Sequence, residues 1–177
     1  MNAVARCGLW LGLGFVLLAS SSSVSAVDVE LGQPAPDFLL PSVHADQIPV
    51  ALSNYRGRVV YLDFWSAWCV PCRETMPALD ALRRDLPRDE FEVIAVNVDA
   101  VVADARRYLE QVPVSYPVAL DANGATARRY GVTTLPASLL IDREGTVRRA
   151  VRATATEDVR ALRTAVSSLI EGDDIQQ

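Results

Sequence analysis

Residues 59–72 read VVYLDFWSAWCVPC. The first seven of these residues are almost continuously apolar, which is typical of a strand that is buried on both faces. Apolar side chains then recur at helical spacing, which predicts a helix from Pro71 to about Leu86. Cys69 and Cys72 therefore lie at a strand-to-helix junction. The positive end of the helix dipole favours the thiolate form of a cysteine in this position.

Two thiols at this spacing can close into a disulfide and reopen, because a thiolate attacks disulfides. The pair therefore predicts a redox centre. Cys69 is the candidate nucleophile, since it lies at the helix start and is expected to be the more exposed thiol. Cys72, one turn inside, is the candidate resolving thiol.

Two other interpretations of the cysteine pair stay open. Tetrahedral zinc needs about two further nitrogen or sulfur ligands, and beyond residue 26 the chain has one His and no other Cys. A purely structural disulfide would close a very short loop and contribute little stabilisation. The chain is therefore expected to use no metal and no cofactor.

The rest of the chain predicts the α/β class, with one mostly parallel sheet covered by helices on both faces and an antiparallel edge. A β-hairpin is expected at the start of the domain. The predicted strands are 37–40, 48–52, 59–65, 91–98, 116–120, 138–142 and 146–151. The predicted helices are 71–86, 103–111, 122–130 and 156–170.

The first 26 residues have the pattern of a secretory signal peptide: one Arg, an apolar run of about 13 residues and small residues before a cleavage site after Ala26. The predicted domains are therefore 1–26, the signal peptide, and 27–177, a single folded domain. An uncleaved membrane anchor is the alternative. Export would place the domain in the periplasm, where disulfides persist.

Composition excludes several partners. Half of the residues are hydrophobic and 22% are charged, as in a folded domain, and the formal net charge is −5. An acidic chain whose Arg residues are scattered is a poor match for nucleic acid or an anionic membrane. We expect a monomer.

Several motifs together resemble one family. They are Trp68-Cys69-Val70-Pro71-Cys72, Pro77, Thr134-Leu135-Pro136, the opening 32–38 and the strand end 96–99. Over about residues 31–170 the chain resembles the TlpA/ResA-like exported thiol–disulfide oxidoreductases of the thioredoxin superfamily. The resemblance implies a thioredoxin fold, with a central mixed sheet flanked by helices and an N-terminal β-hairpin extension.

Asp63 is an ionisable residue in a strand predicted to be buried, and burial should raise its pKa. The resemblance implies that it takes the proton of the resolving Cys72. Thioredoxin places a Lys near this Asp, where the matching residue here is Ala95. Many TlpA/ResA-like proteins carry a buried Glu where this chain has Thr75. Glu74 comes one residue before that position, and one residue turns a helical side chain by about 100°. Glu74 is therefore expected to face solvent and is a weaker candidate for the acid–base role.

The resemblance also implies a substrate-binding surface. Pro136 is expected to follow a cis peptide bond, and the backbone of Leu135 would pair with an extended substrate. Trp68 is expected to form an apolar rim beside Cys69. Val70 and Pro71 lie between the sulfurs, where side chains tune thiolate stability.

The function implied is a periplasmic thiol–disulfide oxidoreductase that reduces protein disulfides through Cys69 and Cys72. A reductant in an oxidising compartment must be recharged, and the family implies a transmembrane electron donor of the DsbD or CcdA type. The expected substrates are disulfide-bearing exported proteins, such as apocytochromes c or copper-delivery proteins.

Four alternative functions stay open. A dedicated cytochrome c maturation thioredoxin often carries Glu where this chain has Ala137. A disulfide-forming oxidase usually has a helical insertion, for which there is little room. A non-catalytic copper-handling or binding module could use the same thiols. Residues 34–38 weakly suggest a peroxidase, but residues 66–69 only faintly match the Thr/Ser-x-x-Cys setting that a peroxidatic cysteine needs.

Overall fold

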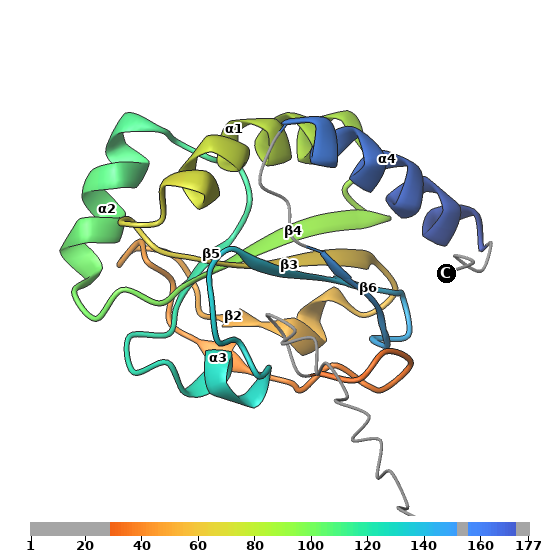
Figure 1. The fold of residues 1–177 in the computed structure, drawn as a ribbon, viewed down its shortest axis with the longest axis horizontal. Helices are drawn as coiled ribbons and strands as arrows, with labels where there is room; N and C mark the ends of the chain where they lie inside the picture. Colours follow the sequence, from red (N-terminus) through yellow and green to blue (C-terminus); the bar gives the residue numbers. More distant parts are fainter. Residues whose placement is uncertain (1–28, 152–155, 173–177) are drawn as a thin grey trace, which may run out of the picture.

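A computed structural model describes residues 29–151 and 156–172, so the predicted signal peptide lies outside the described residues. A five-stranded sheet in the order β5-β4-β3-β6-β7 forms the centre of the domain (Figure 1). Strands β3, β4 and β5 run parallel, whereas β6 and β7 are antiparallel to their neighbours. The strands are β3 (Val59–Trp65), β4 (Phe91–Asn97), β5 (Val118–Leu120), β6 (Ala137–Ile141) and β7 (Val147–Val151). This confirms the predicted mixed α/β sheet.

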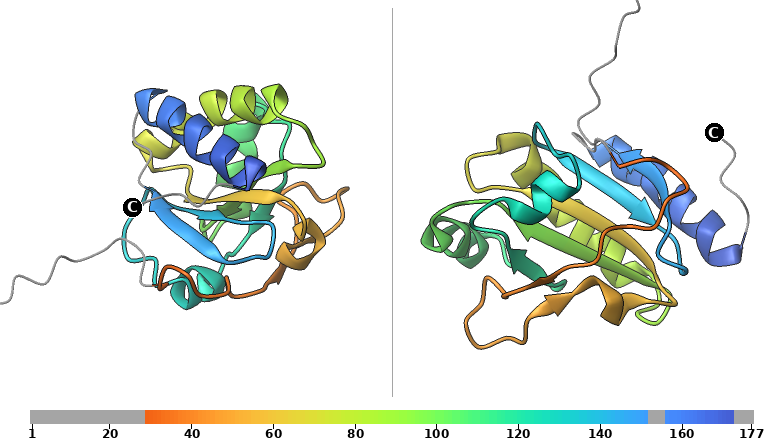
Figure 2. Two further views of the ribbon diagram at one scale, coloured as in Figure 1. Left: turned by 90° about the vertical axis from the view of Figure 1, so that its right-hand side faces the viewer. Right: turned by 90° about the horizontal axis from the view of Figure 1, so that it is seen from below.

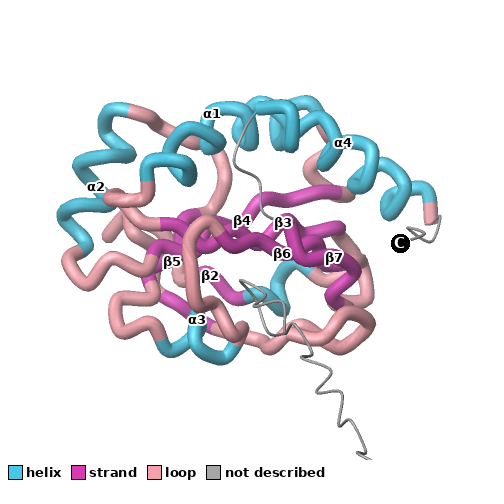
Figure 3. Tube along the Cα trace, viewed as in Figure 1, coloured by secondary structure: helices cyan, strands magenta, loops and turns pink. Residues whose placement is uncertain are grey.

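Two layers cover the sheet. Three helices lie over one face, while α3 and the N-terminal segment lie over the other (Figures 2 and 3). The helices are α1 (Val70–Asp85), α2 (Val102–Gln111), α3 (Ala125–Arg129) and α4 (Thr156–Glu171). Among the described residues, none of these helices has both the length and the apolar character needed to cross a membrane.

Strand β3 is buried at every position. Its side chains alternate between the faces, as in any strand. Tyr61 and Trp65 join the hydrophobic cluster under α1 and α4, whereas Leu62 and Phe64 join the cluster under α3. The apolar run 59–65 is therefore explained by its two buried faces, as predicted.

The predicted N-terminal hairpin is present but short. Strands β1 (Leu39–Leu40) and β2 (Val50–Ala51) pair antiparallel. The pair that would follow Leu40 and Val50 is Pro41 and Pro49. Neither proline can donate a backbone hydrogen bond, so the ladder ends there. A 3₁₀ helix, η1 (Leu52–Tyr55), follows β2, so Leu52 begins this helix and does not end the predicted strand 48–52.

Helix α1 continues through Pro77, which is exposed. A proline has no N–H to donate to the carbonyl four residues earlier, which here belongs to Arg73. The hydroxyl of Tyr108 on α2 donates to that carbonyl at 2.9 Å. Pro77 thus leaves a backbone acceptor free, and this acceptor joins α1 to α2.

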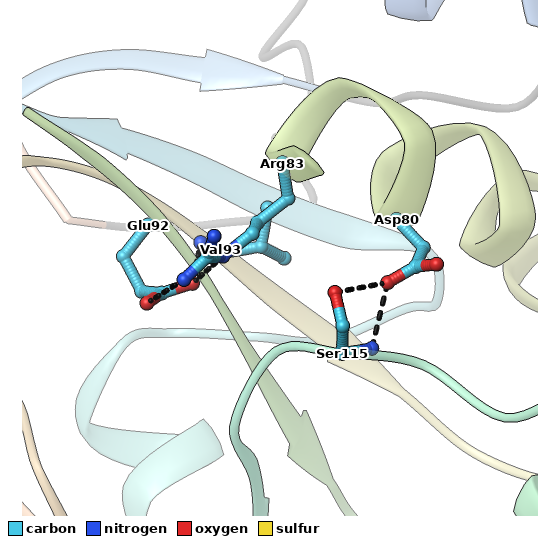
Figure 4. A network of polar contacts seen from close by, with 5 residues as sticks. All are labelled: Asp80, Arg83, Glu92, Val93 and Ser115. Carbon is cyan, nitrogen blue, oxygen red and sulfur yellow. Dashed lines mark hydrogen bonds and ion pairs between the residues drawn. The ribbon is translucent and has the colours of Figure 1, made fainter. Parts of the chain in front are cut away.

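A buried ion pair joins α1 to β4. Arg83 donates from Nε and Nη2 to the two carboxylate oxygens of Glu92, at 2.6 and 2.8 Å, and both residues are buried (Figure 4). One turn away on α1, Asp80 accepts hydrogen bonds from the amide and hydroxyl of Ser115. These contacts attach the last turns of α1 to β4 and to the segment before β5.

The ion pair yields a test of the fold. Replacing Arg83 with Met leaves the Glu92 carboxylate buried and unpaired, which should lower the free energy of unfolding by about 3–5 kcal/mol. Urea denaturation followed by tryptophan fluorescence measures this change. The double variant Arg83→Met/Glu92→Leu is the control, and it should recover most of the loss because no charge stays buried. A loss below about 1 kcal/mol in the single variant would contradict this account.

Candidate active site

The two cysteines form a disulfide at the start of α1, with their Cα atoms 5.3 Å apart. Cys69 is the N-cap residue of the helix, and its sulfur accepts a hydrogen bond from the amide of Cys72 at 3.3 Å. Pro71 lies in the first turn, where its missing N–H costs nothing. Cys69 is 4% exposed and Cys72 is 1% exposed. The predicted junction is confirmed, and the sulfur that caps the helix is placed where a thiolate is favoured.

A polar network holds the loop that leads to Cys69. Asp99 follows the end of β4, and its Oδ2 accepts hydrogen bonds from the amide of Ala67 and the side-chain amide of Asn97, both at 2.8 Å. The amide of Asp99 in turn donates to Oδ1 of Asn97. No role for these residues was predicted. The signal was available, because parallel strands end at the same edge of a sheet and polar residues follow the apolar run of β4.

Asp63 lies in β3 and is 3% exposed. Its Oδ1 accepts a hydrogen bond from the hydroxyl of Ser138 on β6 at 2.7 Å, while its Oδ2 has no protein partner. Burial raises the pKa of Asp63 from 3.8 to about 7, and the Ser138 hydrogen bond opposes this shift only in part. The predicted burial and raised pKa are confirmed. Ala95, the predicted counterpart of the thioredoxin Lys, lies beside Asp63 in the β3–β4 pair.

Asp63 and Cys72 face the same layer of the protein. Asp63 shares its side of β3 with Tyr61 and Trp65, which belong to the hydrophobic cluster that contains both cysteines. The carboxyl group is therefore directed from the sheet toward the layer that holds α1 and both cysteines. The hydrogen-bond partner of Asp63 is the neutral hydroxyl of Ser138, and no residue that the structure describes forms an ion pair with this carboxyl group.

Pro136 follows a cis peptide bond, as predicted. It directly precedes β6, whose first residue, Ala137, pairs with Phe64 near the end of β3. The loop before β6 therefore lies at the same edge of the sheet as the strand end that leads to Cys69. Leu135 is half-buried and packs against the hydrophobic cluster that contains the cysteines.

The side chains around the disulfide differ sharply in exposure. Trp68 is 70% exposed and Val70 is 51% exposed, which confirms an apolar surface beside Cys69. Glu74 is exposed, as predicted, and so lies away from the buried acid at Asp63. Thr75 is buried and donates from its hydroxyl to the carbonyl of Cys72 at 3.0 Å. Of the two predicted acid–base candidates, Asp63 and Glu74, Asp63 is therefore the buried one.

Metal ligands do not gather near the cysteines in the part of the chain that the structure describes. Across residues 29–151 and 156–172 there is no group of three or more His, Cys, Asp or Glu side chains placed to hold an ion. The chemistry that the site offers is that of two sulfurs, a buried acid whose pKa lies near 7 and an apolar surface.

Similarity to known proteins supports a redox role for the cysteine pair. The sequence profile of the AhpC/TSA family matches residues 31–150, a range that includes every site residue described above. The ResA thiol–disulfide oxidoreductase of Geobacillus thermodenitrificans is 31% identical over 161 residues, covering 90% of this chain and 91% of that protein. ResA of Bacillus subtilis is 30% identical and covers 88% of this chain and 83% of that protein.

A solved structure agrees. A Chlorobium tepidum protein assigned as the thiol:disulfide interchange protein DsbE superposes with a TM-score of 0.76 at 40% identity, covering 81% of this chain and 99% of that one. Sequence relatives, structural neighbour and cysteine geometry all point to the same chemistry. The chain therefore belongs to the AhpC/TSA family, as a thiol–disulfide oxidoreductase of the thioredoxin superfamily.

Proposed function

We propose that this chain is an exported reductase of protein disulfides that acts in the periplasm. The observation that carries the proposal is the disulfide-forming pair at the N-terminus of α1, with an exposed apolar surface beside Cys69 and a buried acid beneath the helix. An exposed Trp and Val next to a reactive sulfur suit contact with another polypeptide.

The reaction begins with the reduced pair. The Cys69 thiolate attacks one sulfur of the substrate disulfide, forms a mixed disulfide and releases the other substrate sulfur as a thiolate. Cys72 then loses its proton and attacks the sulfur of Cys69. This step closes the Cys69–Cys72 disulfide and releases the second substrate thiolate. Two electrons pass from the protein to the substrate.

Asp63 is suited to accept the proton of Cys72. A general base works best when its pKa is close to the working pH, and burial brings the pKa of Asp63 to about 7. Since Cys72 is 1% exposed, bulk water has little access to its thiol in the described structure. The acid beneath α1 supplies a nearby acceptor, directly or through one water.

Export and partners form the rest of the proposal. The apolar run before Ala26 supports export to the periplasm, where a reduced pair needs a transmembrane electron donor of the DsbD or CcdA type. The proposed substrates are exported proteins with disulfides, including apocytochromes c and copper-delivery proteins. Ala137, in place of a Glu after the cis-proline, disfavours a dedicated cytochrome c maturation role.

The reduction potential of the Cys69–Cys72 pair tests the direction of electron flow. We expect about −200 mV or lower, measured by equilibrating the purified domain from residue 27 with glutathione or dithiothreitol buffers. A value near −120 mV, typical of strong oxidants, would reverse the proposed direction.

Trapping tests the substrate class. In Cys72→Ala the resolving thiol is absent, so mixed disulfides between Cys69 and its substrates should accumulate and be identified from periplasmic extracts. Cys69→Ala is the matched control and should trap nothing. If Cys72→Ala captures no protein while the wild-type pair binds copper stoichiometrically, the alternative copper-handling role is supported instead.

Substituting Asp63 with Asn tests the proton acceptor. At pH 8 the wild-type carboxyl group is ionised, so Asp63→Asn should slow closure of the Cys69–Cys72 disulfide by about 100-fold. Below pH 6 the wild-type group is protonated and the two proteins should converge. Stopped-flow tryptophan fluorescence measures the rate. Equal rates at both pH values would remove Asp63 from the mechanism.

Stability provides an independent control for the same variant. Burial raises the pKa of Asp63 from 3.8 to about 7. Between these values the folded chain holds a proton that the unfolded chain has lost, so the free energy of unfolding falls as pH rises from about 4 to 7. Asp63→Asn lacks this contribution. Its free energy of unfolding should therefore rise relative to that of the oxidised wild type as the pH increases across that window. A constant difference in urea denaturation would show that Asp63 titrates normally.

A further inference from the structure

A pocket of about 310 Å³ lies beside the exposed Trp68. Its walls come from the loop before Cys69, from α1 and from α2. The lining residues are Ala67, Trp68, Arg73, Asp99, Asp104, Arg107, Tyr108 and Gln111. The reaction described above assigns no task to the charged side chains in this pocket.

The charged side chains in the pocket differ in whether they have partners within the protein. Arg107 forms an ion pair with Asp104 at 3.1 Å. Asp99 accepts the two hydrogen bonds that hold the loop before Cys69. By contrast, Arg73 forms no ion pair with any residue that the structure describes, and its Nε is buried without a hydrogen-bond acceptor. Arg73 thus lines the pocket with a positive charge that no described residue pairs, and an anion in the pocket would pair it.

Arg73 is held in place rather than free to move. The carbon of its guanidinium group lies 5.5 Å from the ring centroid of Tyr108. The hydroxyl of the same tyrosine donates to the backbone carbonyl of Arg73, the acceptor that Pro77 leaves free. The tyrosine thus contacts both the backbone and the cation. Such preorganisation lowers the entropic cost of binding a ligand.

The cation is also close to the reactive sulfur. The amide of Arg73 donates to the carbonyl of Cys69 at 3.2 Å, so the two residues lie one turn apart on the helix. An extended substrate advances about 3.3 Å per residue. A side chain two or three residues from the attacked cysteine can therefore reach the pocket next to Trp68.

We propose that Arg73 and its pocket form a subsite for an acidic side chain of the substrate, so that the preferred substrates carry Asp or Glu two or three residues from the cysteine that Cys69 attacks. The carboxylate binds the guanidinium group, which offers it paired N–H donors, and Trp68 covers the adjoining segment. This inference rests on the proposed disulfide reductase function and names the substrate class for that site.

Three peptides test the subsite. Each is a symmetric dimer linked through one cysteine, and they differ only in having Glu, Gln or Lys two residues from it. Stopped-flow tryptophan fluorescence gives the rate constant for their reduction by the reduced domain. The wild type should reduce the Glu dimer about fivefold faster than the Gln dimer, the effect of an exposed ion pair, and this preference should shrink as salt is added.

Variants assign the preference to Arg73. In Arg73→Gln the Glu and Gln dimers should react equally fast, and Arg73→Glu should prefer the Lys dimer. Arg84→Gln is the matched control, since it removes the same charge from the same helix about three turns away and should keep the wild-type preference.

The outcomes distinguish the proposed subsite from the proposed reductase function. If the wild type reduces the Gln dimer but shows no preference for Glu, the subsite is wrong and the reductase function stands. If Arg73→Gln slows all three dimers equally, Arg73 acts on the Cys69 thiolate and the subsite is again wrong. If the wild type reduces none of the dimers, the proposed function fails and the subsite fails with it.

Discussion

Burial of strand β3 on both faces is the constraint on which the active site depends. The strand has a hydrogen-bonded neighbour at each edge and a hydrophobic cluster against each face, so the chain leaves it at a fixed point. Helix α1 begins five residues after Trp65, with Cys69 as its N-cap. Asp99 and Asn97, at the end of the neighbouring β4, hold the short loop between β3 and α1. The sulfurs therefore occupy a position set by the core of the sheet.

The same core places one acid where water is excluded. A carboxyl group in this environment resists ionisation, and Ser138 supplies a neutral partner in place of a cation. The result is a pKa close to neutral for Asp63. The opposite solution occurs at the far end of α1, where the buried Glu92 is paired with Arg83 through two hydrogen bonds. Asp63 therefore has a pKa of about 7, whereas Glu92 is held by a buried cation.

Local patterns predicted much of this structure. The strand Val59–Trp65, the start of α1 and the exposure of Glu74 follow from hydrophobic periodicity and from the turn of a helix, which act within a few residues. Predictions were weaker where distant residues set the outcome. The hairpin is short because Pro41 opposes Pro49 across the two strands. The link between α1 and α2 exists because a carbonyl freed by Pro77 meets a tyrosine from another helix.

The amino-acid sequence by itself determined the fold class, the redox pair and the burial of Asp63, because the spacing of apolar residues and of two cysteines is local information. The family resemblance supplied the cis-proline. Tertiary structure alone decided that Ser138 is the partner of Asp63, that Asp99 holds the loop before Cys69 and that Arg73 has no anionic partner among the described residues. These three facts depend on contacts between residues of separate strands and helices. The long-range packing of the whole sheet determines those contacts.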